Sequence, residues 1–203
     1  MNSEELILGF DARVMPGESG PAWTQERMNI FLMRLDIVQP LSVDRIVWPS
    51  VPGANGPTNS GSWNGLDLWQ DLQAFQTYLK EPEVSFASPY WIISISLLAN
   101  ALTVDEQNLW APRLPLATLA IQFEAWSFLG YDIADLSLLS GLSNCSYKQE
   151  HIELARKRWA PHLNRFHLFD EQREAIEFKA FSDQRVPEHA QFFVYGIYRL
   201  KGI

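Results

Sequence analysis

One short stretch of the chain, GYDIADLSLLSGLSNC at residues 130–145, gathers most of the residues that could do chemistry. It contains two carboxylates, Asp132 and Asp135, three serines, and the single cysteine of the chain, Cys145. Paired carboxylates can act as general acid and base when their surroundings separate their pKa values, and a cysteine beside a base can act as a nucleophile. The residue types alone leave two interpretations open, an active site or a surface that another macromolecule binds.

The sequence around these residues lacks the motifs of known catalytic sites. All four histidines follow Cys145, and sequence spacing does not bring any of them to its sulfur. Ser140 lies in the sequence LLSGL, which lacks the flanking glycines of a G-x-S-x-G nucleophile elbow, and there is neither an H-E-x-x-H motif nor a glycine-rich phosphate loop. We therefore predict no catalytic residue, metal or cofactor. Two alternatives stay open: a small hydrolase that uses Cys145, Asp132 or Asp135, or aspartates that cap turns.

The charge of the chain bears on its partners. With 24 Asp and Glu against 16 Lys and Arg, the net charge is −8, which repels phosphate backbones and attracts basic surfaces. A single cysteine excludes an intramolecular disulfide, and the start MNSEELILGF carries glutamates where a signal peptide carries basic residues. The most apolar window, residues 90–104, is too short and too polar to cross a membrane. We expect a cytoplasmic protein that binds neither nucleic acid nor membrane directly.

Aromatic residues are the other unusual feature, with eight Trp, twelve Phe and six Tyr. The core should take most of them, because indole rings bury a large area. Tryptophans in or beside predicted loops are harder to bury; these are Trp23, Trp48, Trp63 and Trp110. Exposed aromatic residues flanked by acidic groups are typical of protein-binding surfaces.

Alternating or β-branched apolar residues predict strands, and apolar residues spaced by three and four predict helices. The predicted strands span residues 5–14, 28–38, 90–98, 116–131 and 190–203, and the apolar spacing within 28–38 also fits a helix. The predicted helices span residues 66–81, 146–163 and 169–183, with Asn64 or Asp67 as the cap of the first and Asp170 as the cap of the last.

Long loops are predicted at 49–65, which is rich in Pro and Gly, and after residue 98, where the sequence APRLP occurs. Strands and helices do not alternate regularly, and we detect no internal repeat. We therefore predict one α+β domain over residues 1–203, with a mainly antiparallel, twisted sheet and several packed helices.

Three segments of the C-terminal part resemble a known group of proteins. They are FLGYDIADLSLLSGLSNCSY (128–147), WAPHLNRFHLF (159–169) and FSDQRVPEHAQFFVYGIYRL (181–200). They resemble immunity proteins of bacterial contact-dependent or polymorphic toxin systems, in particular those that accompany EndoU-type ribonuclease toxins. The resemblance implies a non-enzymatic cytoplasmic protein that binds a cognate toxin domain and blocks its active site. These families share no catalytic motif, so no residue role is carried over.

The charge of the chain is compatible with such a partner. Ribonuclease sites present basic residues to RNA phosphate, and an acidic protein can occupy that surface with carboxylates. The expected partner is therefore a basic toxin domain, and the expected contacts are Asp132 and Asp135, with Tyr131 and Trp63 as aromatic anchors. A structural subunit of a homo-oligomer is a further alternative.

Overall fold

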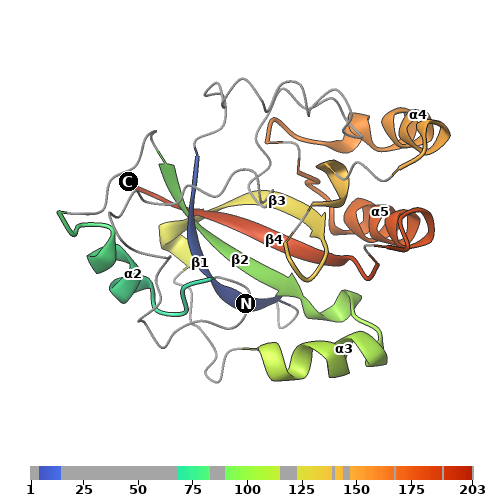
Figure 1. The fold of residues 1–203 in the computed structure, drawn as a ribbon. Coiled ribbons are helices and arrows are strands. Elements are labelled where there is room, and N and C mark those ends of the chain that lie inside the picture. Colours follow the sequence, from blue (N-terminus) through green and yellow to red (C-terminus); the bar gives the residue numbers. More distant parts are fainter. Residues whose placement is uncertain are drawn as a thin grey trace.

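A computed structural model describes residues 5–14, 68–82, 90–114, 123–138, 140–143, 147–166, 168–188 and 190–202. These residues form one antiparallel sheet in the order β1-β2-β4-β3, with helices packed against it (Figure 1). The strands are β1 (Glu5–Val14), β2 (Tyr90–Leu98), β3 (Trp126–Ala134) and β4 (Phe193–Leu200). The α-helices are α2 (Leu72–Tyr78), α3 (Val104–Trp110), α4 (Gln149–Arg158) and α5 (Gln172–Arg185). The predicted α+β class with an antiparallel sheet is confirmed.

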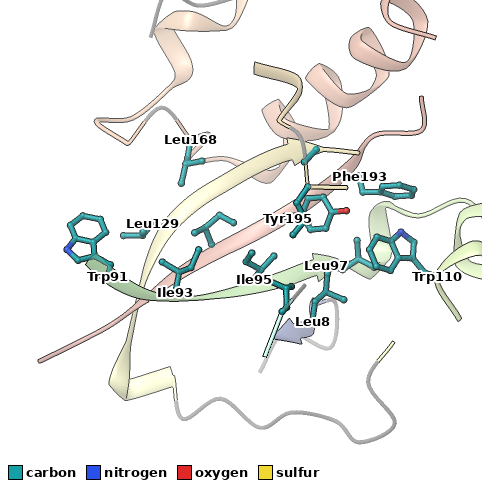
Figure 2. Close-up of a cluster of buried hydrophobic side chains, with 14 residues drawn as sticks. Leu8, Trp91, Ile93, Ile95, Leu97, Trp110, Leu129, Leu168, Phe193 and Tyr195 are labelled. Atoms are coloured by element: carbon teal, nitrogen blue, oxygen red, sulfur yellow. The ribbon is translucent and has the colours of Figure 1, made fainter. Parts of the chain in front are cut away.

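Both faces of the sheet carry buried side chains, which successive residues of a strand supply in turn because they point to opposite faces. On one face, Ile93, Ile95 and Leu97 of β2 pack with residues of β4 and with Trp110 at the end of α3 (Figure 2). The other face carries two separate clusters. One lies under α4 and α5, and the other lies against α2, which flanks the opposite end of the sheet (Figure 1).

The two outer strands contain the same four-residue pattern, Leu-Gly-aromatic-Asp, at residues 8–11 of β1 and 129–132 of β3. In each strand the register shifts just before the glycine, which marks a β-bulge. The aromatic residue then exchanges two backbone hydrogen bonds with a short segment outside the sheet. Phe10 pairs with Trp69 at 2.7 and 2.9 Å, and Tyr131 pairs with Phe169 at 2.7 and 2.9 Å. Both outer strands thus have part of their free edge paired.

Glycine is required at both bulges. Gly9 has φ +155° and Gly130 has φ +137°, values that a residue with a Cβ rarely adopts. A Cβ at Gly9 would lie 2.5 Å from the Trp69 carbonyl oxygen, and one at Gly130 would lie 2.6 Å from the Leu168 Cβ. The glycines therefore allow the outer segments to approach the backbone of the bulge.

The register of the sheet relates the two halves by a pseudo-two-fold axis. Gly9 is opposite Ile95 and Gly130 is opposite Ile197, while Ile95 and Ile197 face each other at the centre of the sheet. The segment that pairs with each bulge leads into a helix, α2 or α5, and then into a central strand. The prediction of no internal repeat is therefore wrong. The repeat lies in the register and backbone, and only the short Leu-Gly-aromatic-Asp pattern marks it in the sequence.

Several element boundaries differ from the predictions. Helix α2 begins at Leu72 rather than residue 66, with Asp71 as its N-cap, because the preceding Trp69 pairs with β1. Residues 123–125 form a 3₁₀ turn instead of strand, and α5 is preceded by Glu171 at the N-cap instead of Asp170. The predicted strand at 28–38, the loop at 49–65 and the caps Asn64 and Asp67 lie outside the described residues, as do Trp23, Trp48 and Trp63.

Helix α3 was missed, although its N-terminal signal is present in the sequence. The Thr103 Oγ1 accepts a hydrogen bond from the Glu106 backbone N–H, and the Glu106 carboxylate accepts one from the Thr103 N–H. This capping box starts the helix within the predicted loop. Trp110 at its end is 0 % exposed, so the expectation that it is hard to bury is wrong. No helix of the described residues has the length and apolar character to cross a membrane.

A buried ion network joins α3 to α5. The Lys179 Nζ donates to Glu106 Oε1 and to Asp183 Oδ2, both at 2.8 Å, and Asp183 Oδ1 accepts from the Phe192 N–H at 2.8 Å. Every member of the network has a hydrogen-bond partner, as a buried charge requires. The network therefore ties the missed helix to the helix that covers the sheet.

Candidate functional site

Asp132, predicted as a contact in an acidic loop, lies in β3 and is 0 % exposed. Its Oδ1 accepts hydrogen bonds from Ser140 Oγ at 2.8 Å and from the Ile133 N–H at 2.7 Å, while its Oδ2 has no partner in the described residues. Burial raises the pKa of Asp132 to about 7, against the lowering effect of these two hydrogen bonds. The predicted loop position at the surface is wrong, because Asp132 lies in a strand that directs its side chain into the core.

The pseudo-symmetric residue explains why an aspartate stands at this position. Asp11 occupies the same place in β1, and its Oδ1 accepts a hydrogen bond from the Ala12 N–H at 2.7 Å, just as Asp132 does from Ile133. Both halves thus use the carboxylate to bind the backbone beside the bulge. Asp132 therefore belongs to the construction of the sheet.

Asp135 forms the turn that follows β3. Its Oδ1 accepts from the Ser137 N–H at 2.8 Å, and its carbonyl oxygen accepts from the Leu138 N–H at 3.0 Å. The Tyr195 hydroxyl donates to the same carbonyl at 3.1 Å. The alternative that this aspartate organises a turn is confirmed. Trp63 and Cys145 lie outside the described residues.

Tyr131 points to the opposite face of the sheet from Asp132 and meets a second carboxylate. Its hydroxyl donates to Glu5 Oε1 at 3.3 Å. The Glu5 Oε2 accepts from Ser96 Oγ at 2.6 Å and from the Tyr198 hydroxyl at 2.7 Å. Three hydroxyls, one from each of β2, β3 and β4, thus converge on a carboxylate from β1. We call Glu5, Ser96, Phe128, Tyr131 and Tyr198 the Glu5 site.

Small residues form the floor of the Glu5 site. A Cβ on Gly196 would lie 2.6 Å from Ser96 Oγ and 2.9 Å from Glu5 Oε2, so the glycine provides the space that the carboxylate occupies. Ser96 is only 1 % exposed, whereas Glu5 and Tyr131 are half-buried. The site is therefore closed toward the sheet and reaches solvent on its other side.

An exposed aromatic ring completes the site. Phe128 is 42 % exposed, and its ring lies 4.9 Å from the Tyr131 ring and 5.1 Å from the Tyr198 ring, measured between centroids. Large apolar side chains of this exposure are few in the described residues: Val104, Leu154 and Ile176 are the others. Of these, Phe128 alone packs against the aromatic rings of a polar site.

The hydrogen-bond partners of the Glu5 carboxylate within the described residues are hydroxyl groups. Burial, followed by the hydrogen bond to Glu5, raises the pKa of Tyr198 above its ordinary value, so this hydroxyl stays protonated and donates. Among the residues that the structure describes, no lysine, arginine or histidine forms an ion pair with Glu5. The arrangement can therefore hold a cationic group at its open side.

The pair of residues related to Glu5 and Tyr131 by the pseudo-two-fold axis has different chemistry. The register places Trp126 where the repeat has Glu5, and Phe10 where it has Tyr131. Phe10 and Trp126 stack with ring centroids 5.7 Å apart. The sheet thus holds an apolar pair at one of these two related positions and a carboxylate with hydroxyl partners at the other.

Sequence reasoning found Tyr131 but missed the other four residues of the Glu5 site. A local signal for part of it exists, since Ser94 and Ser96 interrupt the isoleucines of β2 on a face that is otherwise apolar. No group of His, Cys, Asp and Glu able to hold a metal ion occurs within the described residues. Comparison of the chain with protein-family models, with curated proteins and with solved structures finds no match.

Proposed function

We propose that this protein is a non-enzymatic immunity protein, which binds the basic domain of a cognate bacterial toxin in the cytoplasm and blocks its active-site surface. The toxin is of the ribonuclease class suggested by the resemblance of residues 128–147, 159–169 and 181–200. The observation that carries the proposal is the Glu5 site. Among the described residues its carboxylate has hydroxyl partners and forms no ion pair, and the exposed Phe128 ring packs on the two tyrosines that donate to it.

Two properties of the site support binding to a basic protein. Phe128 supplies rigid apolar area, which interfaces use as an anchor, and Tyr131, predicted as an anchor, packs directly against it. The Glu5 carboxylate supplies charge complementarity, and the net charge of −8 accelerates the encounter with a basic partner. Affinity and steering thus come from different groups of one surface.

The test uses the toxin domain encoded beside this chain in the source genome. Cells that express the toxin domain should stop growing, and co-expression of the chain should restore growth. The purified chain, mixed in equal amount with the purified domain, should abolish cleavage of a fluorescence-quenched RNA. Growth arrest or RNA cleavage that persists when the chain is present and folded contradicts the proposed function.

Matched variants assign the protection to the Glu5 site. A double variant, Glu5→Gln with Phe128→Ala, should weaken protection. Val104→Ala is the control, because Val104 is also an exposed apolar residue, at 71 % exposure, but lies on α3. Equal protection by both variants would show that the Glu5 site is not part of the interface.

A further inference from the structure

We propose that the Glu5 site binds the side chain of one arginine of the partner, with the guanidinium paired to the Glu5 carboxylate and stacked on the exposed ring of Phe128. This inference rests on the proposed function, since it names the group of the basic partner that the site recognises. Three features of the site lead to it: the ability of the Glu5 carboxylate to accept a further hydrogen bond, the aromatic rings, and the rigidity of the site.

The Glu5 carboxylate has room for a further donor. Its Oε2 accepts two hydrogen bonds, at 2.6 and 2.7 Å, whereas its Oε1 accepts one from Tyr131 at 3.3 Å. A carboxylate oxygen has two lone pairs, so Oε1 can accept a second and shorter bond. A charged donor is favoured there, because the hydroxyls around Glu5 bring no positive charge.

The aromatic rings favour arginine over lysine. A guanidinium is planar and weakly hydrated, so it can stack on a ring while its edge donates to a carboxylate, whereas an ammonium is a compact and strongly hydrated charge. The chain itself uses this contact elsewhere. The guanidinium carbon of Arg199 lies 4.2 Å from the centre of the Trp91 ring, and that of Arg158 lies 4.5 Å from the Trp159 ring.

The site is organised before any partner arrives. Its residues come from all four strands of the sheet, and Tyr131 is held by backbone hydrogen bonds to Phe169 at 2.7 and 2.9 Å. A preformed site loses little side-chain entropy on binding. Most of the conformational entropy lost in this contact is therefore that of the arginine side chain.

The test titrates the isotope-labelled chain with N-acetyl-arginine methylamide and follows the ring resonances of Phe128 and Tyr131 by NMR. The lysine and citrulline derivatives serve as probes, because citrulline has the shape of arginine without its charge. We expect saturable shifts with the arginine derivative. The citrulline derivative should bind at least about tenfold more weakly, and the affinity of the lysine derivative should lie between the two. Citrulline binding as tightly as arginine, or no shift with arginine, overturns the inference.

Variants place the binding at Glu5. Glu5→Gln should weaken arginine binding about tenfold, whereas Glu150→Gln, which removes the same charge from a side chain 75 % exposed on α4, should leave it unchanged. If Glu5→Gln does not fold, Phe128→Ala at the exposed ring replaces it, with a loss of about fivefold expected. Unchanged affinity in the folded variant rejects the site.

The two proposals fail separately. Toxin neutralisation by a chain that shows no preference for arginine rejects the arginine assignment and leaves the proposed function standing. Arginine binding that depends on Glu5, by a chain that does not neutralise the toxin domain, supports the assignment of the site and rejects the toxin as its partner.

Discussion

The β1–β2 and β3–β4 halves of the sheet build the same bulge from the same residue types. They differ in the side chains that their outer strands place on the face of the sheet that carries the Glu5 site. Each half has a glycine at positive φ, an aromatic residue paired to an outer segment, and an aspartate that binds the next backbone N–H. Phe10 of β1 packs against Trp126 of β3, whereas in the symmetry-related pair Tyr131 of β3 donates a hydrogen bond to Glu5 of β1.

The difference separates residues that the fold needs from residues that it can vary. Positions that are alike in both halves, such as Gly9 and Gly130, serve the backbone geometry. Positions that differ, such as Glu5 and Trp126, are free to take another role. By this criterion Asp132, a prominent candidate in the sequence, is structural, and Glu5 is the functional candidate.

Substitution of the bulge glycines, Gly9 and Gly130, should give the largest loss of stability. A Cβ would meet the Trp69 carbonyl oxygen at 2.5 Å in Gly9→Ala and Leu168 at 2.6 Å in Gly130→Ala, each at a positive φ. We expect each variant to lose about 5 kcal/mol of unfolding free energy, from backbone strain and overpacking together, as measured by urea denaturation.

Gly202 is the control for these two variants. Its φ is also positive, at +83°, but no atom lies within 4 Å of a Cβ built there. Gly202→Ala should therefore cost only about 1 kcal/mol, the strain of the backbone alone. Equal losses at all three glycines would show that the outer segments do not approach the bulges as described.

The buried carboxylate of Asp132 should make the second half sensitive to pH. Its pKa is about 7 in the folded chain, and about 3.9 is usual for an unfolded one, so the folded state keeps a proton that the unfolded state loses between these values. Stability contributed by Asp132 is present at low pH and falls as pH rises. Between pH 5 and 8 the loss should be about 3 kcal/mol.

Asp132→Asn should remove this dependence, since the amide is neutral at every pH. Urea denaturation of the wild type and the variant at pH 5 and pH 8 measures the difference between their slopes. A slope that is the same in the Asp132 variant and the wild type would contradict the buried position of this carboxylate.

Reciprocal substitutions of the paired aromatic residues sharpen the comparison. Phe10→Tyr places a hydroxyl in an apolar stack against Trp126, at a residue only 4 % exposed, and should cost about 2 kcal/mol. Tyr131→Phe removes a hydrogen bond of 3.3 Å at a half-buried position and should cost about 0.5 kcal/mol. Thermal or urea denaturation of both variants tests this order. A cost for Phe10→Tyr no larger than that for Tyr131→Phe would contradict the apolar surroundings of Phe10.

The local elements of this fold could be predicted from the sequence, but the Glu5 site could not. Alternating and β-branched residues predicted β1 and β2 with their observed bounds, and helical spacing predicted α4 and α5. The Glu5 site depends on long-range register, which brings Glu5 beside Leu98 and Tyr131 beside Gly196. No local pattern contains that register, whereas the repeated Leu-Gly-aromatic-Asp pattern could have identified Asp132 as structural.

Asp135 gives the smallest expected effect and tests where the partner surface ends. It was predicted as a toxin contact together with Asp132, but its side chain also forms the turn after β3. Asp135→Asn removes the charge and retains the turn, because asparagine accepts the same hydrogen bond from the Ser137 N–H. We expect association with the toxin domain to slow about twofold at low salt, and the difference to vanish at high salt. Stopped-flow fluorescence measures both rates. Association at the wild-type rate in low salt would exclude Asp135 from the contact surface.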